Sequence, residues 1–314
     1  MERSKNASRV GVKLRHPTPA ARNMLAADPP PQSTSDVSDV DQHIAETGNT
    51  RVRWEGAARV SLGSELINRI LYEAQAIVTG QREPERLRAF PDCLEDVLVK
   101  VSGDPRLIGD PRLVPLKANA ENLVVSFRYH DRMSGIPVHD EQGTRDRPYD
   151  LTVSFDAAKI DAALHSLGLE PWKEPRPRLA LFVGVQNGPT PYVLSSDGDR
   201  GLEQRLSLTA AAYKRGMSIV LPAASMLAGA DVRFDRLSKI DLERWAALAK
   251  DAGGDAALIG TLFWIEQEFG WRADWRLVSH GDHRWQIRGV NFDAAFRNAM
   301  AGSAQILSGR GEPK

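Results

Sequence analysis

Hydrophobic residues recur at two spacings along the chain, and these spacings predict strands alternating with helices. The run Tyr72–Val78 alternates between polar and apolar residues, which is typical of a strand. From Leu87 to Val101 the apolar residues recur at steps of three and four, which predicts a helix ending before Gly103. Pro91 must either kink this helix or begin its second half, because proline cannot donate the hydrogen bond of a helix interior.

The same periodicities continue as far as a proline-rich segment. A short helical stretch at about residues 116–123 leads into an extended segment at about 124–129, and a strand is expected at 149–155. Asp156 follows this strand and is placed to cap the next helix, since an aspartate side chain accepts hydrogen bonds from free helix amides. The segment 170–177 is rich enough in proline to be stiff, and we expect it to connect two subdomains.

Beyond the connector the pattern becomes more regular. Strands are expected at residues 179–185, 217–221, 257–265, 271–279 and 284–289. Helices are expected at about residues 202–215, 242–252 and 292–307. The first of these helices is marked by Leu202, Leu206, Ala210 and Tyr213. A strand, a helix and a strand in succession indicate a parallel pair with a crossover, and the turn at 280–283 predicts a hairpin between the last two strands.

The predicted fold class is therefore α/β, with α+β character in the N-terminal half and two small mixed-sheet subdomains packed with helices. Residues 1–50 are expected to form a disordered tail, because they are polar, proline-rich and poor in apolar residues. The N-terminal α/β subdomain is placed at residues 66–170. The C-terminal α/β subdomain, with its terminal hairpin and helix, is placed at residues 177–308.

Composition excludes some functions and leaves others open. Lysine plus arginine and aspartate plus glutamate both number 41, so no net charge favours nucleic acid as a partner. No apolar stretch is long enough for a transmembrane segment. The single cysteine, Cys93, lies on the apolar stripe of the first long helix and is expected to be a buried thiol without a catalytic role. The basic N-terminus has no apolar core of a signal peptide, so the sequence leaves the localisation unknown.

Several stretches together resemble a bacterial family catalogued as domain of unknown function 2066, over about residues 70–290. They are residues 72–80, 95–103, 149–155 with 167–168, 171–172 with 176–177, 215–222 and 270–275. The resemblance implies no activity, cofactor or catalytic residue, because none is established for that family. Its members commonly begin with an export signal, so the resemblance implies a periplasmic or envelope location.

Motifs of the common enzyme classes are missing from the sequence. No P-loop, dinucleotide-binding glycine pattern, serine-hydrolase elbow or paired zinc-ligand motif occurs, so we expect no cofactor, no metal and no catalytic residue of those classes. Charged and histidine side chains do gather in one polar loop. Its candidate interaction residues are His139, Asp140, Glu141, Arg145, Asp146 and Arg147.

Three interpretations of this loop stay open. Its arginines could pair with its own carboxylates at a solvated surface, it could bind a partner, or it could form a metal or acid/base site with help from His130 or Asp131. The function expected is that of a non-catalytic accessory or binding protein, which meets an unknown protein partner through one subdomain or the cleft between the two. The alternative is a hydrolase of unrecognised class that uses a His/Asp/Glu cluster with His139.

Overall fold

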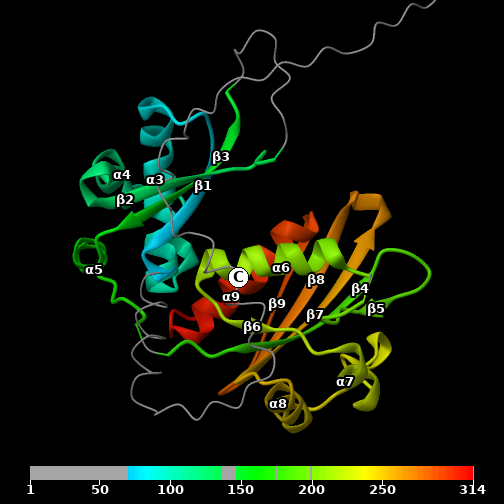
Figure 1. Cartoon of the computed structure of the whole chain (residues 1–314). Coiled ribbons are helices and arrows are strands. Elements are labelled where there is room, and N and C mark those ends of the chain that lie inside the picture. The colour runs from blue at the N-terminus through cyan, green and yellow to red at the C-terminus, as the bar shows by residue number, and fades with distance from the viewer. Residues whose placement is uncertain (1–69, 136–145, 174, 199, 314) are drawn as a thin grey trace, which may run out of the picture. The chain divides into compact units, whose positions relative to one another are not determined.

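The computed structural model describes residues 70–135, 146–173, 175–198 and 200–313, which form two β-sheets covered by helices (Figure 1). All of these residues belong to one compact unit, Glu55–Lys314. The α/β fold class is confirmed. The predicted tail at residues 1–50 lies outside the described residues, and the subdomain boundaries at 66–170 and 177–308 stay a prediction.

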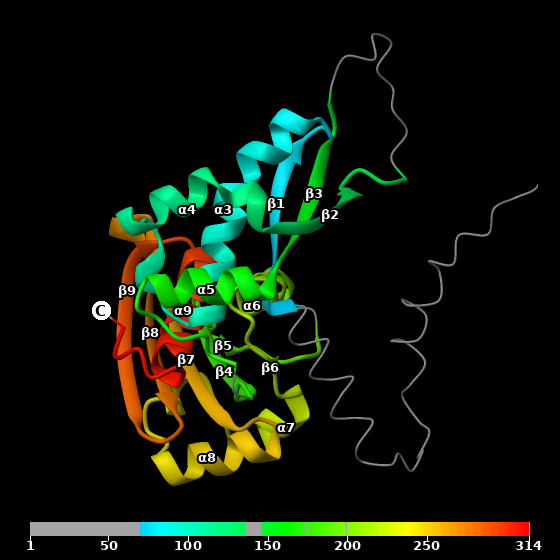
Figure 2. The ribbon, with the colours of Figure 1, turned by 90° about the vertical axis from the view of Figure 1, so that its left-hand side faces the viewer.

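The N-terminal sheet has three antiparallel strands in the order β1-β3-β2 (Figure 2). Its strands are β1 (Glu73–Thr79), β2 (Val124–Asp131) and β3 (Pro148–Phe155). The helices packed with it are α3 (Glu83–Ser102), α4 (Val114–Ala118) and α5 (Ala157–Ser166), with short 3-10 turns at Pro105–Leu107, Pro111–Leu113 and Ala120–Leu123. The antiparallel pairing agrees with the α+β character expected of this half.

Helix α3 supplies most of the N-terminal core. It is a single helix of 20 residues with Pro91 inside it, so the proline neither ends nor divides it. Gly103 ends the helix at a φ of 71°, a left-handed conformation that glycine adopts without steric cost. Cys93 is buried against this core, as predicted. The sequence pattern therefore located both the helix and its inward face.

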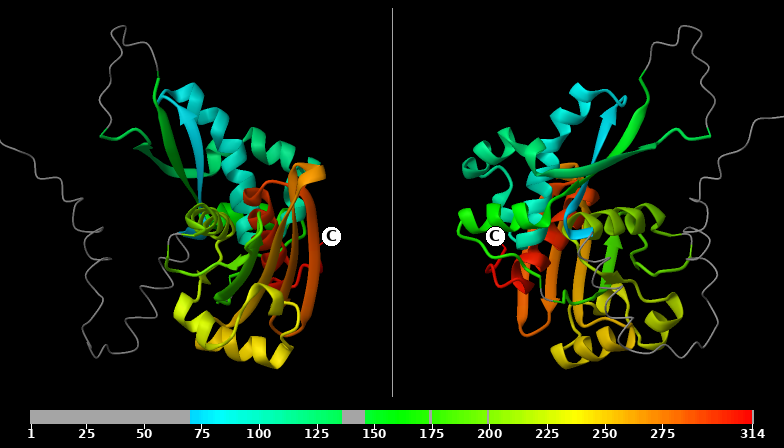
Figure 3. Two further views of the ribbon diagram at one scale, coloured as in Figure 1. Left: turned by 90° about the vertical axis from the view of Figure 1, so that its right-hand side faces the viewer. Right: turned by 60° about the vertical axis from the view of Figure 1, so that its left-hand side comes forward.

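The C-terminal sheet is mixed, with the strand order β5-β4-β7-β8-β9 and β6 beside β4. Its strands are β4 (Leu179–Gln186), β5 (Tyr192–Val193), β6 (Ile219–Val220), β7 (Ala256–Ile265), β8 (Gly270–Val278) and β9 (Asp282–Val290). Strand β4 runs parallel to β6 and β7, and the other described pairs are antiparallel. The parallel crossover and the β8–β9 hairpin are both confirmed, and Figure 3 shows the hairpin from two sides.

Helices cover both faces of this sheet. Helices α6 (Leu202–Arg215) and α9 (Phe292–Leu307) lie on one face, and α7 (Ala224–Gly229) and α8 (Leu242–Asp251) lie on the other (Figure 1). Each face has its own apolar cluster, because the strands are buried on both sides. None of the helices among the described residues is long and apolar enough to span a membrane.

Candidate functional site

The loop proposed from the sequence is described only at its C-terminal end. His139, Asp140, Glu141 and Arg145 lie outside the described residues. Asp146 accepts a hydrogen bond from Arg82 at the start of α3, and Arg147 Nη1 donates to Asp131 Oδ2 at 2.8 Å. Within the described part of the chain no group of three or more His, Cys, Asp or Glu side chains could hold a metal ion. The interpretations of the loop itself stay predictions.

Strand β1 forms an edge of the N-terminal sheet, and no described strand pairs with its outer side. The main-chain oxygen of Tyr72 accepts from the N–H of Phe155 at 2.9 Å, and the N–H of Gly80 donates to the main-chain oxygen of Arg147 at 2.8 Å. The main-chain groups of the even-numbered residues of β1 therefore point toward β3. In an antiparallel pair the N–H and C=O of one residue point to the same side of the strand. The main-chain groups of the odd-numbered residues of β1 therefore point outward, away from β3. Those whose main-chain groups lack a hydrogen bond to any described residue are Gln75, Ile77 and Thr79.

The sheet's two edges differ in their protection. Strand β2, at the opposite edge, has a bulge between Val124 and Ser126 and carries Arg128 and His130. Bulges and charges are the usual devices that keep an edge strand from pairing with another chain. Strand β1 has neither between Ala74 and Thr79. Its edge therefore remains competent to pair with a further strand.

Helix α6 presents an apolar row to solvent on the side that does not touch its own core. The row consists of Leu202, Leu206, Ala210 and Tyr213, and Leu206 is 57% exposed. These are the residues that predicted the helix, yet the face that packs inward is a different one. The inward face consists of Leu208, Ala211, Ala212 and Arg215. An apolar row that its own fold leaves uncovered is a feature of interaction surfaces.

The open edge of β1 and the apolar row of α6 border one cavity of about 620 Å³. We name it the β1–α6 groove. Its lining residues are Ala74, Gln75, Asp96, Lys100, Leu206, Thr209, Ala210, Tyr213 and Lys214. Strand β1 contributes the first two of these residues, α3 contributes Asp96 and Lys100, and α6 contributes the others. The groove thus combines a pairing edge, an apolar wall and a charged floor.

Lys100 lies in the floor of the groove and is only 2% exposed. Its Nζ atom donates to the main-chain oxygens of Glu73 at 2.7 Å and Ile70 at 3.2 Å, and it lies 5.0 Å from the centre of the Tyr213 ring. The pKa of Lys100 is lowered to about 8, chiefly by burial and also by the positive charges of Arg176 and Arg215, which together outweigh the opposite effect of the Asp96 and Glu73 carboxylates. The ammonium group therefore has neutral acceptors but no carboxylate partner among the described residues.

Two arginines, the half-buried Arg176 and the buried Arg215, act on Lys100. Arg176 donates to the main-chain oxygens of Lys100 at 2.7 Å and Arg215 at 2.8 Å, near the C-terminal ends of α3 and α6. Helix C-termini carry partial negative charge, which stabilises a guanidinium there. Burial nevertheless lowers the pKa of Arg176 to about 10. Asp96 is the nearby carboxylate, with Lys214 Nζ at 2.9 Å and Arg215 Nη1 at 3.6 Å.

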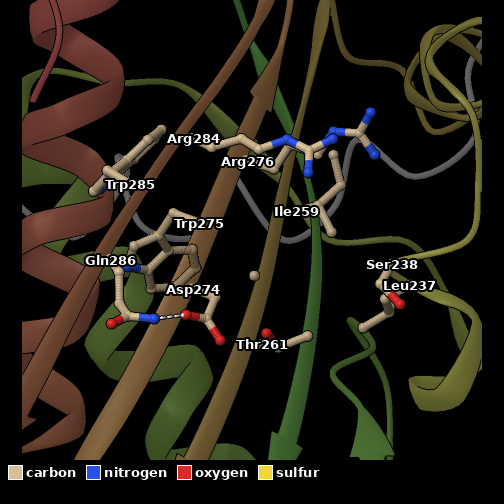
Figure 4. A pocket seen from close by; sticks show the side chains of 11 residues that line it. Leu237, Ser238, Ile259, Thr261, Asp274, Trp275, Arg276, Arg284, Trp285 and Gln286 are labelled. Atoms are coloured by element: carbon tan, nitrogen blue, oxygen red, sulfur yellow. Dashed lines mark hydrogen bonds between the residues drawn. The ribbon is translucent and has the colours of Figure 1, made fainter.

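A second cavity, of about 420 Å³, lies over the outer strands of the C-terminal sheet (Figure 4). Arg276 Nε donates to Asp282 Oδ1 at 2.7 Å, Arg284 Nη2 donates to Asp282 Oδ2 at 3.0 Å, and Gln286 donates to Asp274. Each of its charged side chains thus has a polar partner. The β1–α6 groove is the stronger candidate, because among the described residues Lys100 lacks a carboxylate partner and the outward edge of β1 lacks a paired strand.

Comparison with known proteins gives a family match but no function. A protein-family model described as "Domain of unknown function (DUF8605)" matches residues 68–173. The resemblance to domain of unknown function 2066 was therefore wrong, and the envelope location that it implied loses its support. No curated protein matches the chain. The matched segment includes the β1 and α3 sides of the groove but ends before α6.

The sequence did not reveal this groove, although it contained one signal. Lys100 stands inside the apolar run Val97–Val101, on a helix whose neighbouring residues are buried. A lysine in such a position must find polar partners in the interior or shift its pKa. The open edge of β1 had no comparable signal, because edge and central strands of this length have similar patterns.

Proposed function

We propose that the protein binds an extended segment of a partner protein in the β1–α6 groove. The segment adds a strand to the free edge of β1 and places an apolar side chain against the exposed row of α6. The observation that carries this proposal is that the unpaired main-chain groups of β1 lead directly to that row. Strand addition obtains affinity from main-chain hydrogen bonds and specificity from pockets for alternate side chains.

The two halves of the groove contribute different terms to binding. Gln75, Ile77 and Thr79 offer outward N–H and C=O groups, and each hydrogen bond contributes about 0.5–1.5 kcal/mol net. Burying one large apolar side chain of the segment against Leu206 and Tyr213 contributes about 1.5–3 kcal/mol. These terms are offset by the cost of ordering the segment.

A second copy of this chain suits the groove less well than a separate segment. A symmetric antiparallel pair centred on Ile77 would bring Thr79 of one copy opposite Gln75 of the other. The chain beyond Thr79 continues with Gly80 and Gln81, so the apolar row would meet small or polar residues. The row would then lack an apolar partner.

The test uses a displayed library of random ten-residue peptides selected on the immobilised full chain. The affinities of labelled peptides from the selection are measured by fluorescence anisotropy for the unmodified protein and for two variants. Leu206→Asp puts a charge on the row. Ile77→Pro removes an outward N–H without breaking the hydrogen bonds to β3. Both changes should weaken binding at least about tenfold, the effect of losing one main contact. The matched controls are Leu242→Asp, at an exposed leucine of α8, and Ile77→Thr, which keeps the N–H.

Three outcomes would overturn the proposal. The selection could yield no binding peptide, or its peptides could bind the groove variants and the controls equally well. The third is that sedimentation velocity shows a dimer that Ile77→Pro abolishes, which would assign the edge to a second copy. Circular dichroism of each variant verifies that the secondary structure is retained.

A further inference from the structure

We infer that the segment bound in the β1–α6 groove carries a carboxylate group, which pairs with Lys100. This inference rests on the proposed function and adds the chemical class of the ligand. It concerns a glutamate side chain among the strand-forming residues of the segment. Such a group would complete a site where the described residues give Lys100 no carboxylate partner.

The balance of charge around the groove supports an acidic ligand. Lys100 and the two cations that act on it, Arg176 and Arg215, outnumber the two carboxylates that act on it, Glu73 and Asp96. Both carboxylates already have cationic partners, since Arg128 holds one and Lys214 holds the other. Buried charges are normally paired, because an isolated charge in the interior is costly. The excess is therefore positive and uncompensated within the described residues.

Lys100 is the cation best placed to meet the ligand. The Nη atoms of Arg176 donate to main-chain oxygens, including those of Lys100 and Arg215, and Arg176 stacks at 4.2 Å from the Trp172 ring. Lys100 has three N–H donors, of which two bond to main-chain oxygens. It also lines the groove, whereas Arg176 does not. The third donor has no hydrogen-bond acceptor among the described residues, and it is the one that we assign to a ligand carboxylate.

The surroundings of Lys100 make this pairing dependent on pH. The titratable groups that act on it are Asp96 of its own helix, Glu73 of β1, Arg176 of the connector, and Arg215 with Tyr213 of α6. Arg176 and Arg215 oppose its positive charge, and a bound carboxylate would favour that charge. Binding and protonation of Lys100 are therefore linked, and each strengthens the other.

The experiment compares two synthetic peptide libraries that differ in one respect. Both consist of ten-residue peptides with apolar residues at alternate positions. In the first library all the remaining positions are glutamate. In the second library one of these glutamates at a time is replaced by glutamine. Affinities are measured on the full chain, on Leu206→Asp and on Lys100→Gln, with Lys250→Gln as the control at an exposed lysine of α8. Glutamine at position 100 keeps a donor for the main-chain oxygens but removes the charge.

At pH 7 one glutamate position should strengthen binding about tenfold over glutamine, as expected for a charged hydrogen bond. Lys100→Gln should abolish this preference and Lys250→Gln should leave it unchanged. In the unmodified protein the preference should fall to about twofold by pH 9, because Lys100 then loses its proton. This pH profile tests the inference even if Lys100→Gln does not fold.

The results separate this inference from the proposed function. If both libraries bind, lose affinity with Leu206→Asp and show no preference for glutamate, the groove binds a segment but the inference is wrong. A preference for glutamate that survives Lys100→Gln, or that does not change between pH 7 and pH 9, would also overturn it. If neither library depends on Leu206, the proposed function itself fails.

Discussion

Lys100 should make the free protein more stable as the pH rises from 7 to 9, which is opposite to the effect of most titrating groups in this range. In the folded state its pKa is about 8, and the ordinary value in an unfolded chain is 10.5. Between these two values the unfolded chain binds a proton that the folded protein has released. Stability rises with pH wherever the unfolded state binds more protons. Below pH 8 the buried charge is present in the fold and destabilises it.

The size of the effect follows from the two pKa values. One unit of pKa difference corresponds to about 1.4 kcal/mol. The buried charge therefore costs the fold roughly 3 kcal/mol at low pH, and this cost is fully relieved above about pH 11. Between pH 7 and pH 9 only part of the titration takes place, and the expected gain is roughly 1 kcal/mol. Cys93 acts in the opposite direction above pH 9, because burial raises its pKa from 9.0 to about 12. A comparison with a variant at position 100 removes that contribution.

The assay is urea unfolding at pH 7, 8 and 9, followed by tryptophan fluorescence, for the unmodified protein and for Lys100→Met. The difference between their free energies of unfolding should shift by about 1 kcal/mol in favour of the unmodified protein as the pH rises. Lys250→Met, at an exposed lysine, should give a curve parallel to that of the unmodified protein. Parallel curves for Lys100→Met as well would refute the reasoning, since Lys100 would then have an ordinary pKa in the fold.

Three further predictions concern the framework of the groove and its neighbours. Gly216→Ala should lower the free energy of unfolding, measured in urea titrations, by about 1–3 kcal/mol more than Gly253→Ala. Both glycines have positive φ, but only at Gly216 would the added carbon meet other side chains, the nearest at 2.8 Å. Cys93 should react with a thiol reagent only in denaturant, and rapid labelling of the native protein would contradict its burial. Asp156→Ala should cost about 1 kcal/mol, because Asp156 caps α5 by accepting from Lys159 at 3.1 Å, and an unchanged urea midpoint would show that the cap is dispensable.

Much of the fold could be predicted because local patterns and turn residues agree with it. Strand β1, helix α3, the cap at Asp156 and the β8–β9 hairpin all lie where the sequence placed them. Periodicity did not establish whether Pro91 divides α3. The neighbours of Pro91 pack well enough for the helix to continue through it, at the expense of one main-chain hydrogen bond.

The face of α6 could not be predicted from periodicity alone. Two rows recur at helical spacing on this helix, and the row with the larger apolar residues points to solvent. The inward row consists of Leu208, Arg215 and two alanines, whose small side chains allow α6 to approach α9 closely. The spacing of large apolar residues favours the row with leucines, but close packing between helices favours the row with small side chains. Tertiary packing decided between them.

Three local rules of folding are broken at the same place, and this coincidence is the main argument for a binding site. Within the described residues, an unprotected edge strand favours pairing with another chain, and an apolar row in solvent and a buried Lys100 without a carboxylate partner are unfavourable in an isolated chain. A single extended segment with an apolar side chain and a carboxylate would correct all three. It would pair with Gln75, Ile77 and Thr79, cover Leu206 and neutralise Lys100. Natural folds are otherwise consistent across levels, and their departures from that consistency concentrate at functional sites.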